Sequence, residues 1–223
     1  SFATMFVQSN DLFYGFDDTG LALYDGNGAA VTGDVTSSVT LWDAGTEINE
    51  MPGSGPNQAP RQNGANTGMD ENGVIHLVND AFTYPMTSNV IQVTLAHDGG
   101  TEFTVTLKNV SSGSSLPTPF AGGVWGIHGS GDKLFEDGVT ASAGLESIAE
   151  DGDNAAMEAN LTANTGYASP FAPGVWALHE SGQKPIFTED AADNGDGLEG
   201  LAEDGDPSVL NTALEGNSNV SEN

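Results

Sequence analysis

The stretch FTVTLKNV, residues 103–110, alternates apolar and polar side chains along its length. Phe103, Val105 and Leu107 would share one face of a β-strand, with Thr and Lys on the other, which predicts a half-buried strand. Further strands are predicted for residues 1–9, 21–25, 35–42, 74–78 and 89–95. The turn sequences DGNG, HDGG and PGSGP lie between these runs. The pattern therefore predicts an all-β fold, an antiparallel β-sandwich with a few short helices in the connections.

The second half of the chain contains an internal duplication. PFAGGVWGIHGSGDKLF returns as PFAPGVWALHESGQKPIF, and GLESIAEDGD returns as GLEGLAEDGD, so the two copies span residues 119–161 and 170–214. Two copies are too few for a solenoid, which indicates a local duplication. Each copy predicts a strand, a loop and two short helices. Asp206 is a suitable N-cap for the last helix, with Pro207 at its first position.

The charge of the chain excludes several classes of partner. It holds 32 acidic and four basic side chains, a net charge of −28. Nucleic acid, phosphorylated ligands and anionic lipid surfaces need cationic groups on a protein, so none of them is an expected partner. Three Trp, ten Phe and four Tyr lie in or near alternating apolar runs, which argues against disorder. A salt-rich habitat or loading with extracellular calcium fits this composition better.

The absence of Cys and of a long apolar run excludes further kinds of chemistry and location. The chain has no Cys, so it can form no disulfide, thiol nucleophile or thiolate metal site. No apolar run approaches the roughly 18 residues of a membrane span, and we expect no membrane insertion. Position 1 is Ser rather than an initiator Met. We interpret this as processing, which predicts a location outside the cell or at its surface.

Several blocks resemble a known extracellular module. SFATMFVQSNDLFYGF, followed by LWDAGTEINEMPGSGPNQAPRQNG, resembles the C-terminal half of the spondin N-terminal domain, found in F-spondin, mindin and secreted prokaryotic proteins. FTVTLKNVS, GVWALH and GLEGLAEDGDPSVL resemble the N-terminal half of the same domain, and together the blocks cover nearly all of residues 1–206. The resemblance implies a C2-like β-sandwich, adhesive or matrix-type binding, and a calcium ion at one end of the sandwich.

The two halves occur in reversed order. Residues 1–98 resemble the C-terminal half of the family domain and residues 103–214 the N-terminal half, and a flexible tail is predicted for residues 215–223. Three explanations stay open. The chain could be a circular permutant, or a piece of a longer tandem protein. Alternatively, the C-terminal half of one copy could complete the N-terminal half of the next by strand exchange, which would build an open filament.

The resemblance places the metal region at Asp11 in the SND block and at Asp43 and Glu47 in the DAGTE block. Calcium takes six to eight oxygen ligands on flexible loops. Asp11 and Asp43 each follow a predicted strand, so both carboxylates can reach one rim, and Asp17 in the next turn could add an oxygen. In so acidic a chain, nearly any loop offers similar residues. Spacing alone therefore does not separate a calcium site from a solvated loop.

Other candidate sites have simpler interpretations. DNGDGLE, residues 193–199, lacks the spacing of an EF-hand loop and is predicted to be a solvated turn. Trp125 and Trp176, each followed by a His three residues later, are predicted to be buried core aromatics. If they were exposed, they could serve as stacking platforms of a carbohydrate-binding module.

Catalysis finds little support in the sequence. HGSG at residues 128–131 has no strand, Ser elbow and helix around it, and 32 carboxylates offer too many pairs to single one out. We therefore predict a secreted calcium-binding structural or adhesive protein and no enzyme. Its expected partners are other copies of itself, in a homo-oligomer or filament, and cell-surface or matrix glycans or proteins.

Overall fold

The computed structural model describes residues 1–129, 131, 133–164 and 175–222. It divides into two compact units, residues 1–166 (unit 1) and 167–223 (unit 2), each described by itself below. The described part consists mostly of antiparallel strands with four short α-helices, which confirms the predicted fold class in its main feature. In these residue ranges we find no helix that is long and apolar enough to cross a lipid bilayer.

A five-stranded antiparallel sheet forms the centre of unit 1. In spatial order its strands are β5 (His76–Leu77), β4 (Thr40–Asp43), β2 (Leu12–Gly15), β1 (Phe2–Phe6) and β8 (Phe120–Trp125). Ser9 shapes the β1–β2 turn, since its hydroxyl donates to the Phe6 carbonyl and accepts from the Leu12 amide. Every residue of β1 and β2 is buried, so both faces of this sheet are covered.

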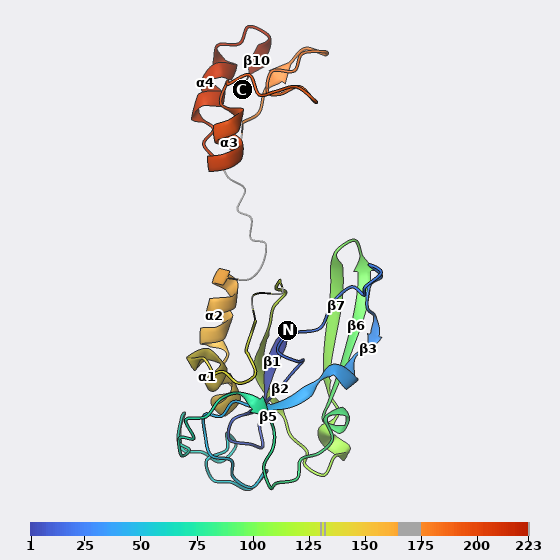
Figure 1. The fold of residues 1–223 in the computed structure, drawn as a ribbon, viewed down its shortest axis with the longest axis vertical. Helices are drawn as coiled ribbons and strands as arrows, with labels where there is room; N and C mark the ends of the chain where they lie inside the picture. Colours follow the sequence, from blue (N-terminus) through green and yellow to red (C-terminus); the bar gives the residue numbers. More distant parts are fainter. Residues whose placement is uncertain (130, 132, 165–174, 223) are drawn as a thin grey trace. The chain divides into compact units, whose positions relative to one another are not determined.

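A second sheet covers one of these faces. Its strands, in spatial order, are β3 (Gly33–Asp34), β6 (Ile91–Gly99) and β7 (Glu102–Asn109). Phe2, Phe6, Leu12 and Tyr14 of the large sheet pack in one apolar cluster with the buried side chains of β6. The two sheets thus form the expected sandwich (Figure 1). Short 3-10 turns occur at Thr36–Ser38, Thr87–Asn89 and Ser111–Gly113.

Two helices cover the opposite face of the large sheet. They are α1 (Ala143–Asp151), whose N-terminus is capped by the Ser142 side chain, and α2 (Ala155–Asn164). Their buried side chains pack with Ala3, Phe13 and Trp42, which point away from the sandwich core. Unit 1 is therefore layered as small sheet, large sheet and helix pair (Figure 1).

Unit 2 repeats the helix pair on a smaller scale. It contains β9 (Leu178–His179), α3 (Leu198–Asp204), α4 (Ser208–Glu215) and β10 (Val220–Glu222), with β9 and β10 antiparallel. The helix begins one residue later than predicted, with Pro207 rather than Asp206 at the N-cap position. The Asp206 carboxylate still accepts from the Ser208 amide at 2.9 Å. The predicted tail, residues 215–223, includes β10. The start of the second copy, residues 170–174, lies outside the described residues.

Three predicted strands differ from the structure, and one strand of the large sheet was not predicted. Residues 35–42 were predicted as one strand, but Thr36–Ser38 form a 3-10 turn and β4 begins at Thr40. Residues 21–25 form no strand and contribute only an isolated bridge at Tyr24. β2 was not predicted, because a strand buried on both faces shows no alternation of apolar and polar residues. FTVTLKNV forms β7, an edge strand of the small sheet, but Val105 and Leu107 are exposed. The alternation predicted the strand correctly and its burial incorrectly.

Candidate metal centre

Three carboxylates from separate segments of unit 1 meet at one end of the large sheet. Asp11, Asp43 and Glu71 each offer an oxygen, and these three oxygens lie within 4.8 Å of one another. Calcium binds oxygen at about 2.3–2.6 Å, so two of its ligands can be up to about 5 Å apart. The spacing of the three oxygens therefore fits a shared calcium ion.

The Asp11 carboxylate is fully buried and held by the loop that follows β4. Its Oδ2 accepts hydrogen bonds from the Thr46 amide at 2.8 Å, the Thr46 hydroxyl at 3.2 Å and the Glu47 amide at 3.0 Å. Its Oδ1 is buried and has no hydrogen-bond partner among the described residues. A buried carboxylate oxygen without a partner is costly. A cation would satisfy it.

The Asp43 carboxylate ends β4 and is positioned by its own turn. Its Oδ1 accepts from the Gly45 amide at 2.8 Å. Gly45 has φ 68°, and a Cβ at this position would lie 2.5 Å from the Val74 carbonyl oxygen. Only Gly fits both the left-handed backbone and this close approach. The DAG sequence is thus explained by the turn that presents Asp43.

A neighbouring amide offers another oxygen close to Asp43. Asn49 Nδ2 donates to Asp43 Oδ2 at 2.6 Å, while Asn49 Oδ1 is buried with no hydrogen-bond partner in the described ranges. Rotating the amide by 180° exchanges its oxygen and nitrogen. Beside a cation, the rotated amide would present a hard oxygen ligand from the same loop.

Glu71 completes the cluster, and the sequence analysis missed it. It lies in the segment that leads into β5, and its amide donates to the Thr46 carbonyl at 2.8 Å. The Gly73 amide likewise donates to the Gly45 carbonyl at 2.7 Å, so the two segments run side by side. The only sequence signal is an acidic turn, MDENG, just before the predicted strand at 74–78. In this chain such turns are common.

Two of the four predicted ligands lie outside this cluster. Glu47 is buried, but its Oε1 accepts from the Gly68 amide at 2.8 Å and its Oε2 from Asn10 Nδ2 at 3.2 Å. Asp17 is exposed, and its Oδ1 accepts from the amide and hydroxyl of Thr19. The structure thus brings together Asp11 and Asp43, uses Glu47 to anchor a loop, and places Asp17 in a surface turn.

Burial leaves these acids poorly stabilised as anions. Desolvation, followed by the charge of Asp43, raises the pKa of Asp11 to about 7. Burial also raises the pKa of Asp43 and, together with the Asp43 charge, that of Glu71. In the described part of the chain, neither Lys nor Arg pairs with them, and His76 Nε2 lies 3.9 Å from Asp43 Oδ2. Among the residues that the structure describes, the cluster thus lacks a strong counter-charge.

Glu150, another buried acid near the cluster, also has a raised pKa. Glu150 at the end of α1 is buried, and desolvation raises its pKa to about 7, with the Thr46 hydrogen bond acting in the opposite direction. The charges of Glu47 and Asp11 raise this pKa further. The end of the sandwich therefore concentrates negative charge in a low-dielectric region, where a divalent cation would interact strongly.

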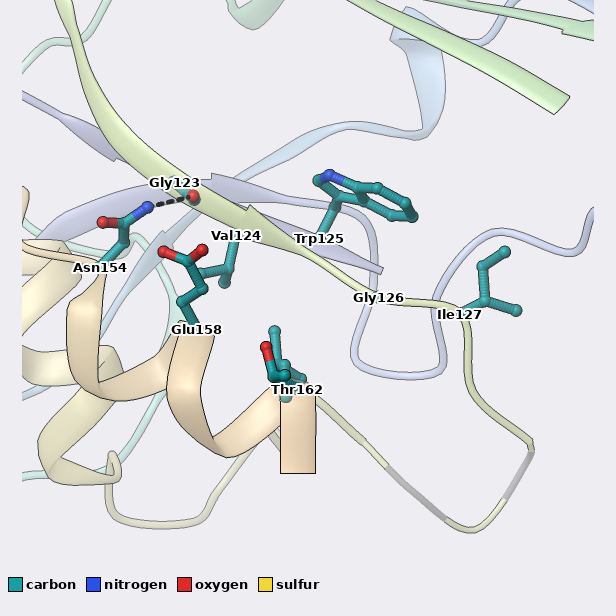
Figure 2. Close-up of a pocket in the computed structure, with 9 residues that line it drawn as sticks. Gly123, Val124, Trp125, Gly126, Ile127, Asn154, Glu158 and Thr162 are labelled. Atoms are coloured by element: carbon teal, nitrogen blue, oxygen red, sulfur yellow. Dashed lines mark hydrogen bonds between the residues drawn. The ribbon is translucent and has the colours of Figure 1, made fainter. Parts of the chain in front are cut away.

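The tryptophans form a different surface from the one expected. Trp125 and Trp176 are 73% and 60% exposed, so the prediction that they are buried is wrong. Trp125 is the last residue of β8, the edge strand of the large sheet. It lines a pocket of about 440 Å³ with Asn154, Glu158 and Thr162 of the α2 region (Figure 2). In Figure 2 the indole points away from Glu158 and Asn154, whose side-chain amide donates to the Gly123 carbonyl at 2.8 Å.

Comparisons with protein-family models, curated proteins and solved structures found no match to this chain.

Proposed function

We propose that this chain is a secreted structural or adhesive protein whose β-sandwich is stabilised by calcium. The single observation that carries the calcium assignment is the buried, unpartnered Oδ1 of Asp11, within a cluster that also includes Asp43 and Glu71. The net charge of −28 and the resemblance of the SND and DAGTE blocks to the spondin family support a location outside the cell.

Calcium fits this donor set better than the other common metals. The donors are carboxylate oxygens, with an amide oxygen available nearby, and such hard ligands suit calcium. Zinc would prefer nitrogen or thiolate ligands. The chain has no Cys, and His76 Nδ1 is hydrogen-bonded to the Val74 carbonyl at 2.9 Å.

A bound ion would supply positive charge where three chain segments meet. Asp11 precedes β2, Asp43 ends β4, and Glu71 lies before β5. Each segment is already fixed by backbone hydrogen bonds, so the acids are preorganised for binding. Holding the three together would stabilise one end of the sandwich and the loop of residues 46–71.

The test is thermal unfolding with calcium and with EDTA at a fixed, high ionic strength. Calcium at about a hundred times its Kd would stabilise the fold by about 2.7 kcal/mol. Asp43→Asn should abolish the shift, whereas Asp17→Asn, in a surface turn, should retain it. An identical melting temperature in calcium and EDTA would refute the calcium assignment. Magnesium at equal ionic strength separates specific binding from screening.

A second candidate function is binding of carbohydrate at Trp125. Exposed indoles can stack against sugar rings, and Trp125 lines the pocket in Figure 2 together with Asn154 and Glu158. Binding of neutral glycans should quench Trp fluorescence, and Trp125→Ala should abolish the binding and the change in fluorescence. Trp176→Ala is the matched control in unit 2. Binding that survives Trp125→Ala would reject this site.

A further inference from the structure

The helix pairs of the two duplicated segments have similar local structure but different surroundings. In unit 1, Gly144 of α1 approaches Met157 of α2, and in unit 2 the corresponding Gly197 approaches Leu210 of α4. Both helix pairs share two sequence blocks, GLE at the start of the first helix and AEDGD at its end. The corresponding aspartates, Asp153 and Asp206, each accept from the amide two residues later. Unit 2 is therefore a second copy of the segment that contains α1 and α2.

A corresponding pair of Phe residues shows the difference most clearly. Phe135 in unit 1 is 6% exposed and contacts the rings of Phe13 and Trp42, with centroids 5.0 Å and 5.2 Å away. Its counterpart Phe187 in unit 2 is 66% exposed. The same apolar side chain is thus part of a core in one copy and faces solvent in the other.

The first helix of each copy differs in the same way. Leu145, Ile148 and Ala149 of α1 are fully buried against the large sheet. Their counterparts in α3 are Leu198, Leu201 and Ala202, none of which is buried. We call Phe187 and these three residues the docking face of unit 2. Its members keep the apolar character that docking on a sheet requires.

In unit 1, the corresponding apolar residues Phe135, Leu145, Ile148 and Ala149 pack against a defined surface of the large sheet. It consists of the helix-facing side chains of the large sheet and its rim, and we call it the acceptor face: Ala3, Phe13, Trp42, Ala44 and Ile75. β8 adds an antiparallel strand pairing with β1, for example between Ala3 and Val124. The acceptor face thus binds the first copy through apolar packing and backbone hydrogen bonds together.

We propose that unit 2 is a second docking segment and that its partner is the acceptor face of another copy of this chain. This proposal is based on the packing of the first copy, which contains α1 and α2, against the acceptor face in unit 1. This inference rests on the structural or adhesive role proposed above, and it names another copy of the chain as the partner in that role.

The docking would be an exchange. Each copy has one acceptor face, filled by its own residues 120–161, so unit 2 can dock only where that segment has left, as in domain swapping. The exchange replaces one set of apolar contacts by a similar set. Its equilibrium is therefore set by small differences between the two copies, such as Ile148 against Leu201.

Site-specific crosslinking tests this docking in full-length chains, which contain no natural Cys. Gln62 Nε2 donates to Asp151 Oδ1 at 2.7 Å in unit 1, and Asp204 is the counterpart of Asp151. An acceptor chain would carry Gln62→Cys, with Ile148→Asp and Leu201→Asp to disable both of its own docking segments. A tagged donor chain would carry only Asp204→Cys. A short bismaleimide should then join the two chains.

Two controls make the crosslink specific. A donor with Asp190→Cys, elsewhere on unit 2, should give at least fivefold less heterodimer. A donor with Asp204→Cys and Leu201→Asp should also give at least fivefold less heterodimer, because docking would bury the new Asp side chain in an apolar contact. Equal yields from all three donors would overturn the proposal.

A second variant avoids dependence on the fold of the acceptor chain. Ala143→Asp, Ser147→Gly and Ile148→Leu together convert α1 into the sequence of residues 196–204, which include α3. If α3 fits the acceptor face, this chain should unfold cooperatively within several degrees of the parent, while Ile148→Asp should not. A non-cooperative triple variant would also overturn the proposal. Calcium dependence is measured separately, so its absence would leave both results unaffected.

Discussion

Neutralising Asp11 should raise the melting temperature of the metal-free protein at pH 8. In EDTA the buried Asp11 has its pKa raised from 3.8 to about 7, because desolvation and the charge of Asp43 disfavour the anion. An acid whose pKa is raised on folding stabilises the folded state while it is protonated. That contribution is present below pH 3.8 and is lost as the pH rises through about 7.

The magnitude follows from the size of the shift. A shift of about three pH units corresponds to at most about 4 kcal/mol. For a unit of this size, 1 kcal/mol changes the melting temperature by about 2–4 °C. Only the loss between pH 5 and about 7 falls in the comparison of pH 5 with pH 8, and it is about 2.7 kcal/mol. The metal-free protein should therefore melt roughly 5–10 °C lower at pH 8 than at pH 5. Calcium should restore most of this loss at pH 8 and little at pH 5, where protons compete for the ligands.

Asp11→Asn tests the cause directly. The Asn oxygen can accept from the Thr46 and Glu47 amides as Asp11 Oδ2 does, while the charge is removed. In EDTA at pH 8, this variant should melt above the parent, and calcium should no longer stabilise it. Asp17→Asn is the matched surface control. The reasoning would be refuted if Asp11→Asn melted well below the parent in EDTA, or if the parent showed no pH dependence between 5 and 8.

Further substitutions test the site and the core. Glu71→Gln should weaken calcium binding by about tenfold or more in titration calorimetry, and unchanged affinity would exclude Glu71 as a ligand. Gly45→Ala should cost about 2 kcal/mol or more in chemical denaturation, because the residue has φ 68° and a Cβ would meet Val74; a cost near zero would contradict the packing. Phe135→Ala should destabilise unit 1 by about 3–5 kcal/mol, whereas Phe187→Ala should change the stability of the monomer by about 0.5 kcal/mol or less. Similar losses for both would contradict their different burial.

Long-range pairing decided which acids form the candidate site. The sequence predicted Asp11 and Asp43 as ligands, and the structure brings these two together. Glu71 joins them only because the segment before β5 runs beside residues 45–46, which no local pattern indicates. Glu47 lies in the same DAGTE block as Asp43, yet its carboxylate points toward Gly68 and Asn10. Proximity in sequence does not fix the direction of a side chain in a loop.

What the sequence determined by itself is local. Alternation along FTVTLKNV predicted a strand, and the duplicated GLE and AEDGD blocks predicted two helix pairs. Asp206 predicted a side-chain bond to a free amide at the start of the last helix, although the N-cap is Pro207. Each of these features depends on residues a few positions apart. The tertiary structure alone decided burial. Trp125 is exposed because it ends an edge strand, and Phe135 is buried while Phe187 is not, although their sequences match. Burial depends on what covers a side chain, and the cover can come from segments far away in the sequence, as where Phe13 and Trp42 contact Phe135.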